Sequence, residues 1–320
     1  MAPAGAWVRG VSAEESIGPA QFETALGIAP GTLPAHTVEM LRLAKLRYSR
    51  VSAVEQAELE AEASERVKQG FTVVGEQRAG IWRDAWQDQL DRFEAANFAV
   101  ESLNPAFVDG SVVLRWQGGY IRSLSDKFEL RVIEILRDAV FRLFLSDVDS
   151  LYEFGSGSAF NVAAYSKIFP EVPVCALDWA PAAVRIAELL REKLGMKIRG
   201  ERFDFFNPNK DLKLGPGAGV FTFCALEQVG PRFEPFLDFL LEQGPRRVVH
   251  IEPTVELYDP SSSHDRVAIE YHTQRKYLVG LLPALRKLAL EKKINLVHSK
   301  RLNCGSRFHE CYSVHVWEPA

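Results

Sequence analysis

The segment "LYEFGSGSAF", residues 151–160, joins an apolar run to a helical pattern through two glycines that are separated by one residue. A strand that feeds a glycine turn and then a helix presents free backbone N–H groups at the start of the helix, and glycine lets a ligand approach without meeting a Cβ atom. In open α/β sheets, ligands bind at the carboxyl ends of the strands. The segment therefore predicts a nucleotide-binding turn, and the residues around it must identify the ligand.

Two common nucleotide sites fit this turn poorly. A dinucleotide site needs G-x-G-x-x-G, but Phe160 occupies the third glycine position, and no Gly-Lys-Ser/Thr follows as in a P-loop. Glu153, just before the first glycine, would repel a pyrophosphate and attract an ammonium or sulfonium group. Asp178 ends the next apolar run, at the distance where an acid accepts hydrogen bonds from both ribose hydroxyls.

Strand and helix patterns alternate from about residue 148 onward. The predicted strands are 150–154, 172–178, 198–206, 219–226 and 246–253, and the predicted helices are 159–169, 180–195, 232–243 and 268–290. Such alternation predicts a parallel sheet with helices on both faces. The last two strand-like runs, 294–302 and 311–319, are joined by a short turn and must be antiparallel.

The first half of the chain has a different hydrophobic periodicity. Helical patterns dominate it, over 35–51, 53–71, 81–98 and 126–144. We therefore predict two domains, a mainly helical one over 1–145 and an α/β one over 146–320. In the third helix, Trp82, Trp86, Leu90 and Phe93 recur at three- and four-residue steps. This stripe favours core packing over an aromatic ligand site.

Residues 148–320 resemble the class I S-adenosylmethionine-dependent methyltransferases in four motifs and in their order. Residues 153–159 resemble the first motif, E/D-h-G-x-G-x-G, with Ala159 in place of the last glycine. Asp178 matches the ribose-binding acid, Asp204-Phe205 match the pair that holds the adenine, and Leu226-Glu227-Gln228-Val229 resemble the motif after the fourth strand. The resemblance implies a Rossmann-like sheet of seven strands whose last strand is antiparallel.

The resemblance also implies the cofactor, S-adenosylmethionine, with S-adenosylhomocysteine as product, and a set of cofactor-binding residues. These are Glu153, Gly155, Ser156, Gly157, Asp178, Trp179, Asp204, Phe205, Cys224, Ala225 and Leu226. The segment "QGGYIRS", 117–123, could in addition hinge over the cofactor, with Tyr120 or Arg122 reaching the methionine carboxylate.

Methyl transfer from a sulfonium to a hydroxyl requires alignment, exclusion of water and removal of a proton. The polar stretch 252–277 is expected to form part of the substrate wall, and His272 and His264 within it are the preferred bases, because histidine titrates near neutrality. Glu227 is a third candidate, expected rather to organise its loop. His250 alternates with apolar residues and is interpreted as a core histidine.

The leading hypothesis is O-methylation of a small molecule. The alternatives are an N- or C-methyltransferase of a metabolite or peptide, a non-catalytic protein that binds the cofactor, and a nicotinamide-dependent oxidoreductase. A homodimer through the N-terminal helices is a further hypothesis.

Composition narrows the function classes. The chain has 320 residues and a formal net charge of −4, without a dense Lys/Arg block, which argues against nucleic-acid binding. No window is apolar enough for a membrane span, and the start does not resemble a signal peptide. The four cysteines form no CxxC pair, so we expect a cytoplasmic protein without a bound metal, the cluster Cys304, His309 and Cys311 included.

Overall fold

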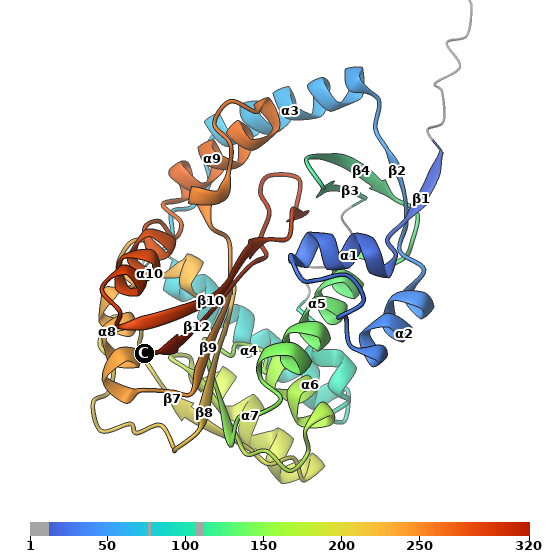
Figure 1. Cartoon of the computed structure of the whole chain (residues 1–320). Helices are drawn as coiled ribbons and strands as arrows, with labels where there is room; N and C mark the ends of the chain where they lie inside the picture. Colours follow the sequence, from blue (N-terminus) through green and yellow to red (C-terminus); the bar gives the residue numbers. More distant parts are fainter. Residues whose placement is uncertain (1–12, 76–77, 106–111) are drawn as a thin grey trace, which may run out of the picture.

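A seven-stranded sheet forms the centre of the computed structural model, which describes residues 13–75, 78–105 and 112–320 (Figure 1). The strand order is β10-β12-β9-β8-β5-β6-β7. The strands are β5 (Ser150–Phe154), β6 (Val174–Asp178), β7 (Ile198–Arg202), β8 (Ala218–Phe223), β9 (Arg247–Glu252), β10 (Ile294–Arg301) and β12 (Ser313–Pro319). Neighbours among β5 to β9 are parallel, and β12 is inserted antiparallel between β9 and β10. The predicted sheet with an antiparallel last strand is confirmed.

Both faces of this sheet are covered, as a parallel sheet requires. Leu151 belongs to an apolar cluster with helices α5 (Phe128–Phe144), α6 (Phe160–Ile168) and α7 (Pro181–Leu194). Phe154 points to the opposite face, where it packs with α8 (Glu234–Gln243) and α10 (Leu281–Leu290). The alternation of side chains along each strand therefore builds two cores, one on each side of the sheet.

The helix predicted over 268–290 is in fact two helices, α9 (Ser263–Arg275) and α10. Lys276, with φ 54°, ends α9, and Gly280, with φ 95°, begins α10. Both residues have left-handed backbone conformations, which a continuous right-handed helix does not allow. The sequence prediction missed this break because α9 also buries one helical face, although that face includes the polar residues Asp265 and His272.

The first half of the chain contains α1 (Pro19–Leu26), α2 (Ala35–Ala44), α3 (Ala53–Lys68) and α4 (Ala79–Ala95), but also strands that the sequence did not predict. A five-stranded sheet has the order β1-β2-β4-β3-β11. Its strands are β1 (Glu14–Ser16), β2 (Arg47–Arg50), β3 (Val113–Trp116), β4 (Gly119–Ser123) and β11 (Cys304–Gly305). We call it the small sheet.

The small sheet corrects two predictions. The helix predicted over 35–51 ends at Ala44, because Lys45 adopts φ 45° and the chain continues as β2. The link between β10 and β12 is not a short turn: it runs over residues 302–312 and carries β11, which pairs with β3. A segment near the end of the chain thus completes a sheet built from its first half.

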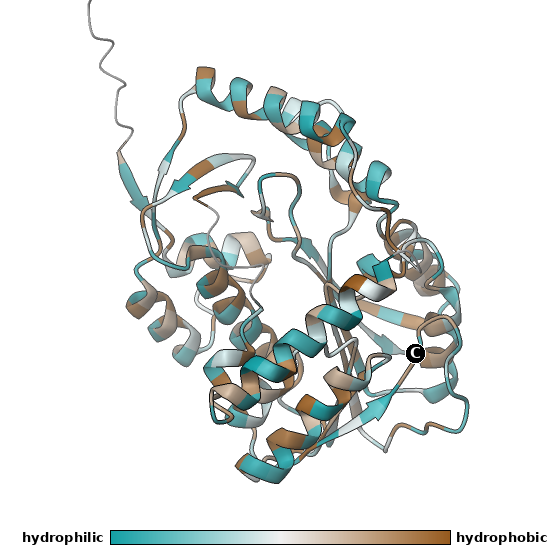
Figure 2. Cartoon of the chain, turned by 180° about the vertical axis from the view of Figure 1, so that it is seen from behind, coloured by the Kyte–Doolittle hydropathy of each residue, from teal (hydrophilic) through white to brown (hydrophobic). Residues whose placement is uncertain are grey.

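Helix α3 packs along α9 at one end of the molecule (Figure 1). It begins at Ser52, whose side chain accepts a hydrogen bond from the backbone N–H of Glu55. Leu59, Ala63 and Val67 are its buried residues, and Figure 2 shows the rest of this helix as mainly hydrophilic. Within the described ranges, no helix has both the length and the apolar character needed to cross a bilayer.

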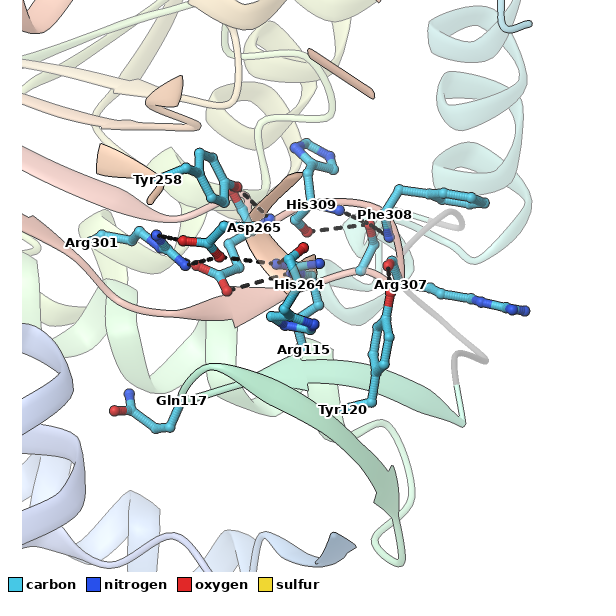
Figure 3. A network of polar contacts seen from close by, with 12 residues as sticks. Arg115, Gln117, Tyr120, Tyr258, His264, Asp265, Arg301, Arg307, Phe308 and His309 are labelled. Atoms are coloured by element: carbon cyan, nitrogen blue, oxygen red, sulfur yellow. Dashed lines mark hydrogen bonds and ion pairs between the residues drawn. The ribbon is translucent and has the colours of Figure 1, made fainter. Parts of the chain in front are cut away.

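A buried charge network joins the small sheet to the main one (Figure 3). Arg301 of β10 donates to both carboxylate oxygens of Asp265 on α9, at 2.8 and 2.7 Å, and also to Glu310. Arg115 of β3, fully buried, donates to Asp265 at 3.3 Å and to Glu310 at 3.4 Å. Two cations and two anions balance each other, so the network is stable only while all four are present.

Removal of one member should therefore destabilise the fold strongly. We expect Asp265→Ala to lower the free energy of unfolding by about 3 kcal/mol, because two guanidinium groups would then share the single carboxylate of Glu310. Urea unfolding followed by circular dichroism measures this change. Glu39→Ala is the matched control, since it breaks the exposed Glu39–Arg42 pair and should change stability little. Equal, small effects of both substitutions would contradict this account.

Candidate functional site

The glycine turn between β5 and α6 lies at the carboxyl edge of the main sheet. Gly155 and Gly157 have φ 75° and 50°, and a Cβ on them would lie 2.4 Å from Ala225 Cβ and 2.7 Å from the Trp86 ring. Both the conformation and the space therefore require glycine at these positions. Ala159, where the resembling motif has its third glycine, also adopts a left-handed φ of 59°. The buried hydroxyl of Ser156 makes no hydrogen bond within the described protein.

Asp178, the last residue of β6, holds this turn in place. Its two carboxylate oxygens accept the backbone N–H groups of Gly157 and Ala180, each at 2.9 Å. Burial raises the pKa of Asp178 to about 6, although these hydrogen bonds favour the ionised form. The side chain thus connects the glycine turn to the start of α7, and each oxygen keeps lone pairs for another donor.

Glu153 lies beneath the turn and is fully buried. Its Oε1 accepts a hydrogen bond from Asn161 Nδ2 of α6 at 2.8 Å, and its Oε2 has no partner among the described residues. Asn161 is in contact with the buried Arg137 of α5, which donates to Phe160 O at 3.0 Å. Burial raises the pKa of Glu153 to about 8, against the opposing effects of Asn161 and Arg137. This placement fits a supporting role better than a direct contact with a ligand cation.

The residues expected to hold the adenosine lie beside the turn. Phe205 approaches Gly155, from whose ideal Cβ its ring is 3.4 Å away, and packs edge-on against Phe236. Asp204 is exposed, and its side chain accepts the backbone N–H of Phe206 at 2.9 Å, as in an Asx-turn. Trp179, directly after Asp178, is partly exposed.

The turn after β8 is held by Glu252. Its side chain, at the end of β9, accepts the backbone N–H groups of Ala225, Leu226 and Glu227 at 3.1, 3.1 and 3.3 Å. Cys224, at the start of this turn, has a left-handed φ of 49°. Strained backbone of this kind is concentrated at functional sites. Glu252, rather than Glu227, organises the loop.

Among the candidate bases, Glu227 has a pKa near neutral pH. Its Oε1 accepts a hydrogen bond from Gln228 Nε2 at 2.6 Å. Burial raises the pKa of Glu227 to about 7, while Gln228, Arg275 and Arg78 oppose the shift. A general base is most effective when its pKa lies near the operating pH.

The two preferred histidines are less suitable. His272 is buried with Nε2 3.2 Å from His309 Nδ1, and His264 is buried with Nδ1 3.0 Å from Gln56 Nε2 of α3. Burial lowers the pKa of each to about 3, so neither imidazole is a strong proton acceptor at neutral pH. His250 is a core histidine as interpreted, with hydrogen bonds to Thr222 and Trp317.

Tyr120 and Arg122 lie on β4, and their contacts do not lead to the glycine turn. The hydroxyl of Tyr120 donates to Arg307 O at 2.8 Å, and its ring packs edge-on against His264 (Figure 3). Arg122 pairs with Glu55 of α3. These contacts do not favour the prediction that either residue reaches the cofactor.

The roles of three residues at this site, Glu252, Asn161 and Trp86, were not predicted from the sequence. Glu252 is the second-last residue of a predicted strand, as Glu153 is, and Asp178 is the last residue of another. This shared position of an acid at a strand end could have revealed the role of Glu252. Asn161 gives no local signal, and Trp86 was visible only as a member of the apolar stripe, because the contacts of both residues depend on how α6 and α4 pack. In the part of the chain that is described, no three His, Cys, Asp or Glu side chains are grouped to hold a metal ion.

Comparisons with known proteins give partial likenesses. No protein-family model and no curated protein matches the chain. Among solved structures, the O-methyltransferase NcsB1 of neocarzinostatin biosynthesis, solved with S-adenosylmethionine and 2-hydroxy-5-methyl naphthoic acid, has a TM-score of 0.41 at 13% identity over 60% of this chain and 58% of its own. The dimethyltransferase RosA of Streptomyces davawensis gives 0.40 at 10% identity over 61% and 57%.

A methyltransferase from Aquifex aeolicus gives a TM-score of 0.41 at 15% identity, over 57% of this chain and 89% of its own. The chain thus covers less than two thirds of the length of NcsB1 and of RosA. At TM-scores this low, the fold assignment rests on the chain's own strand order and not on these likenesses.

The buried Glu153 leads to a prediction on pH. Its pKa is raised from 4.5 to about 8, so the folded protein holds this proton more tightly than the unfolded chain and loses stability as the pH rises through that window. Glu153→Gln removes this loss. We expect the melting temperatures of variant and wild type to agree near about pH 5, and the variant to melt at least about 3 °C higher near about pH 9.

Differential scanning fluorimetry across this pH range measures the difference. The exposed Glu58→Gln is the control and should show no pH-dependent difference. A Glu153→Gln variant that melts lower than wild type at every pH would mean that Glu153 stays ionised and paired with Arg137.

Proposed function

We propose that this protein is a methyltransferase that uses S-adenosylmethionine and releases S-adenosylhomocysteine, with a hydroxyl of a small molecule as acceptor. One observation carries the proposal: residues that match separate motifs in the sequence converge at one edge of the sheet. Gly155 lies against Phe205 and Ala225, and Gly157 is bonded to Asp178. These residues lie at the end of β6 or in the loops after β5, β7 and β8, so their convergence is a property of the fold and not of one local turn.

The side chains present at this edge fit the cofactor. Asp178 is an acceptor with free lone pairs beside a glycine turn, which suits ribose hydroxyls. Ser156 offers a buried hydroxyl that has no partner within the described protein. Phe205 and Trp179 offer ring faces for the adenine, while Ala225 and Leu226 lie in the turn after β8. Glu153 would act from beneath, by fixing the turn through Asn161.

The cofactor supplies a methyl group that is already activated as an electrophile, so the protein must align the acceptor, exclude water and manage one proton. A hydroxyl has to lose its proton as it attacks. Glu227, with its raised pKa, follows β8 at the edge that carries the turn and is the base we propose. Glu252 fixes the backbone of this loop through three amides, and so positions Glu227.

The first experiment tests the cofactor. We expect S-adenosylmethionine and S-adenosylhomocysteine, but not NAD, to raise the melting temperature in a thermal-shift assay. Asp178→Ala should weaken S-adenosylhomocysteine binding at least about tenfold by calorimetry, since about 1.4 kcal/mol of hydrogen bonding corresponds to that factor. Arg122→Ala serves as the control, because Arg122 pairs with Glu55 and should leave the affinity unchanged. A shift with NAD alone, or none with either adenosyl ligand, would refute the proposal.

The second experiment tests the base. A panel of phenolic, sugar and amine acceptors is assayed by S-adenosylhomocysteine release. With a hydroxyl acceptor, we expect Glu227→Gln to lower kcat about 100-fold or more with little change in KM. The wild-type rate should rise with pH through about 7, where Glu227 loses its proton, and the variant should lack this rise. Turnover of amines alone, or an unchanged pH profile in Glu227→Gln, would refute the hydroxyl acceptor or the base, respectively.

A further inference from the structure

Helix α4 lies directly against the glycine turn. An ideal Cβ on Gly157 would be 2.7 Å and 2.8 Å from two ring carbons of Trp86. The Trp86 ring thus lies on the side of Gly157 from which a side chain would project. Leu90 and Phe93, on the same apolar stripe, are buried, but Trp82 and Trp86 are only partly buried. The stripe is therefore core at one end and an accessible aromatic surface at the other.

Helix α4 is also hydrogen-bonded to the turn after β8. Gln228 Oε1 accepts hydrogen bonds from Trp82 Nε1 at 3.1 Å and from the Arg78 guanidinium at 3.0 Å. The rings of Trp82 and Trp86 are stacked, with centroids 5.4 Å apart and an interplanar angle of 24°. Two stacked indoles thus extend from the turn after β5 to the turn after β8.

Gln228 also connects this helix to the proposed base. Its amide nitrogen donates to Glu227 Oε1 at 2.6 Å, while its amide oxygen binds α4. One side chain therefore fixes Glu227 and the indole pair with respect to each other.

We propose that Trp86, supported by Trp82, forms the outer wall of the cofactor site. This inference rests on the proposed function. A ligand that reaches Gly157 must either contact the Trp86 indole or displace it, because the ring lies on that residue. An indole face is suited to both parts of such a ligand: it stacks on adenine, and it attracts a sulfonium cation through its quadrupole. The N-terminal half of the chain thereby contributes directly to cofactor binding and keeps water from the sulfonium.

The wild-type protein labelled with 5-fluorotryptophan tests this wall without a destabilising substitution. Trp86→Phe assigns the fluorine resonance of Trp86 by its loss. We expect this resonance to shift when S-adenosylhomocysteine is added, while those of the fully buried Trp116 and Trp317 shift less. An unmoved Trp86 resonance in a protein that binds the ligand by calorimetry overturns the wall alone. Absence of any adenosyl binding overturns the proposed function and the wall together.

Substitutions give a second, independent measurement. We expect Trp86→Ala to weaken S-adenosylhomocysteine binding at least about tenfold and Trp86→Phe, which keeps a ring, to weaken it less than about threefold. Ile81→Ala is the control, since Ile81 lies on α4 but is half exposed, and it should leave the affinity unchanged. Wild-type affinity in Trp86→Ala would overturn the inference.

Discussion

Buried carboxylates at one edge of the main sheet hold the loops on which the rest of the site depends. Asp178, the last residue of β6, accepts two backbone amides, and Glu252, the last residue of β9, accepts three. Glu153 of β5 reaches the first turn of α6 through Asn161. Parallel strands all point their carboxyl ends to the same edge, where unpaired backbone N–H groups of the following loops collect. Acidic side chains accept hydrogen bonds from these donors. They are buried in doing so, and burial raises the pKa of each.

The sequence predicted the main sheet because its strands and helices carry local periodicities that survive in the fold. It failed where two patterns merge. Leu46 continues the apolar spacing of α2 although Lys45 has already ended the helix, and the helical pattern of α9 is followed by that of α10 with only a short link that contains Gly280. Strand β11 has two residues, too few for any alternation to be recognised. Such elements are decided by tertiary pairing, which local spacing does not record.

The sequence predicted those parts of the site whose residues belong to recognisable motifs. The glycines, Asp178 and Phe205 lie together, as their spacing from successive strands indicates. The proton acceptors were harder, because residue type alone favours histidine, whereas burial decides the basicity: it lowers the pKa of His264 and His272 and raises that of Glu227 into the neutral range. Contacts between the two halves of the chain, such as Trp86 on Gly157, have no counterpart in local sequence.

The pairing of β3 with β11 also constrains the order in which the chain can fold. Residues 113–116 leave the ribosome long before residues 304–305, which complete the small sheet. Until then, the outer edge of β3 presents unpaired backbone groups, the kind of edge on which chains aggregate. The small sheet can close only after residues 304–305 have emerged. A nascent chain released before residue 304 would therefore keep this edge of β3 open.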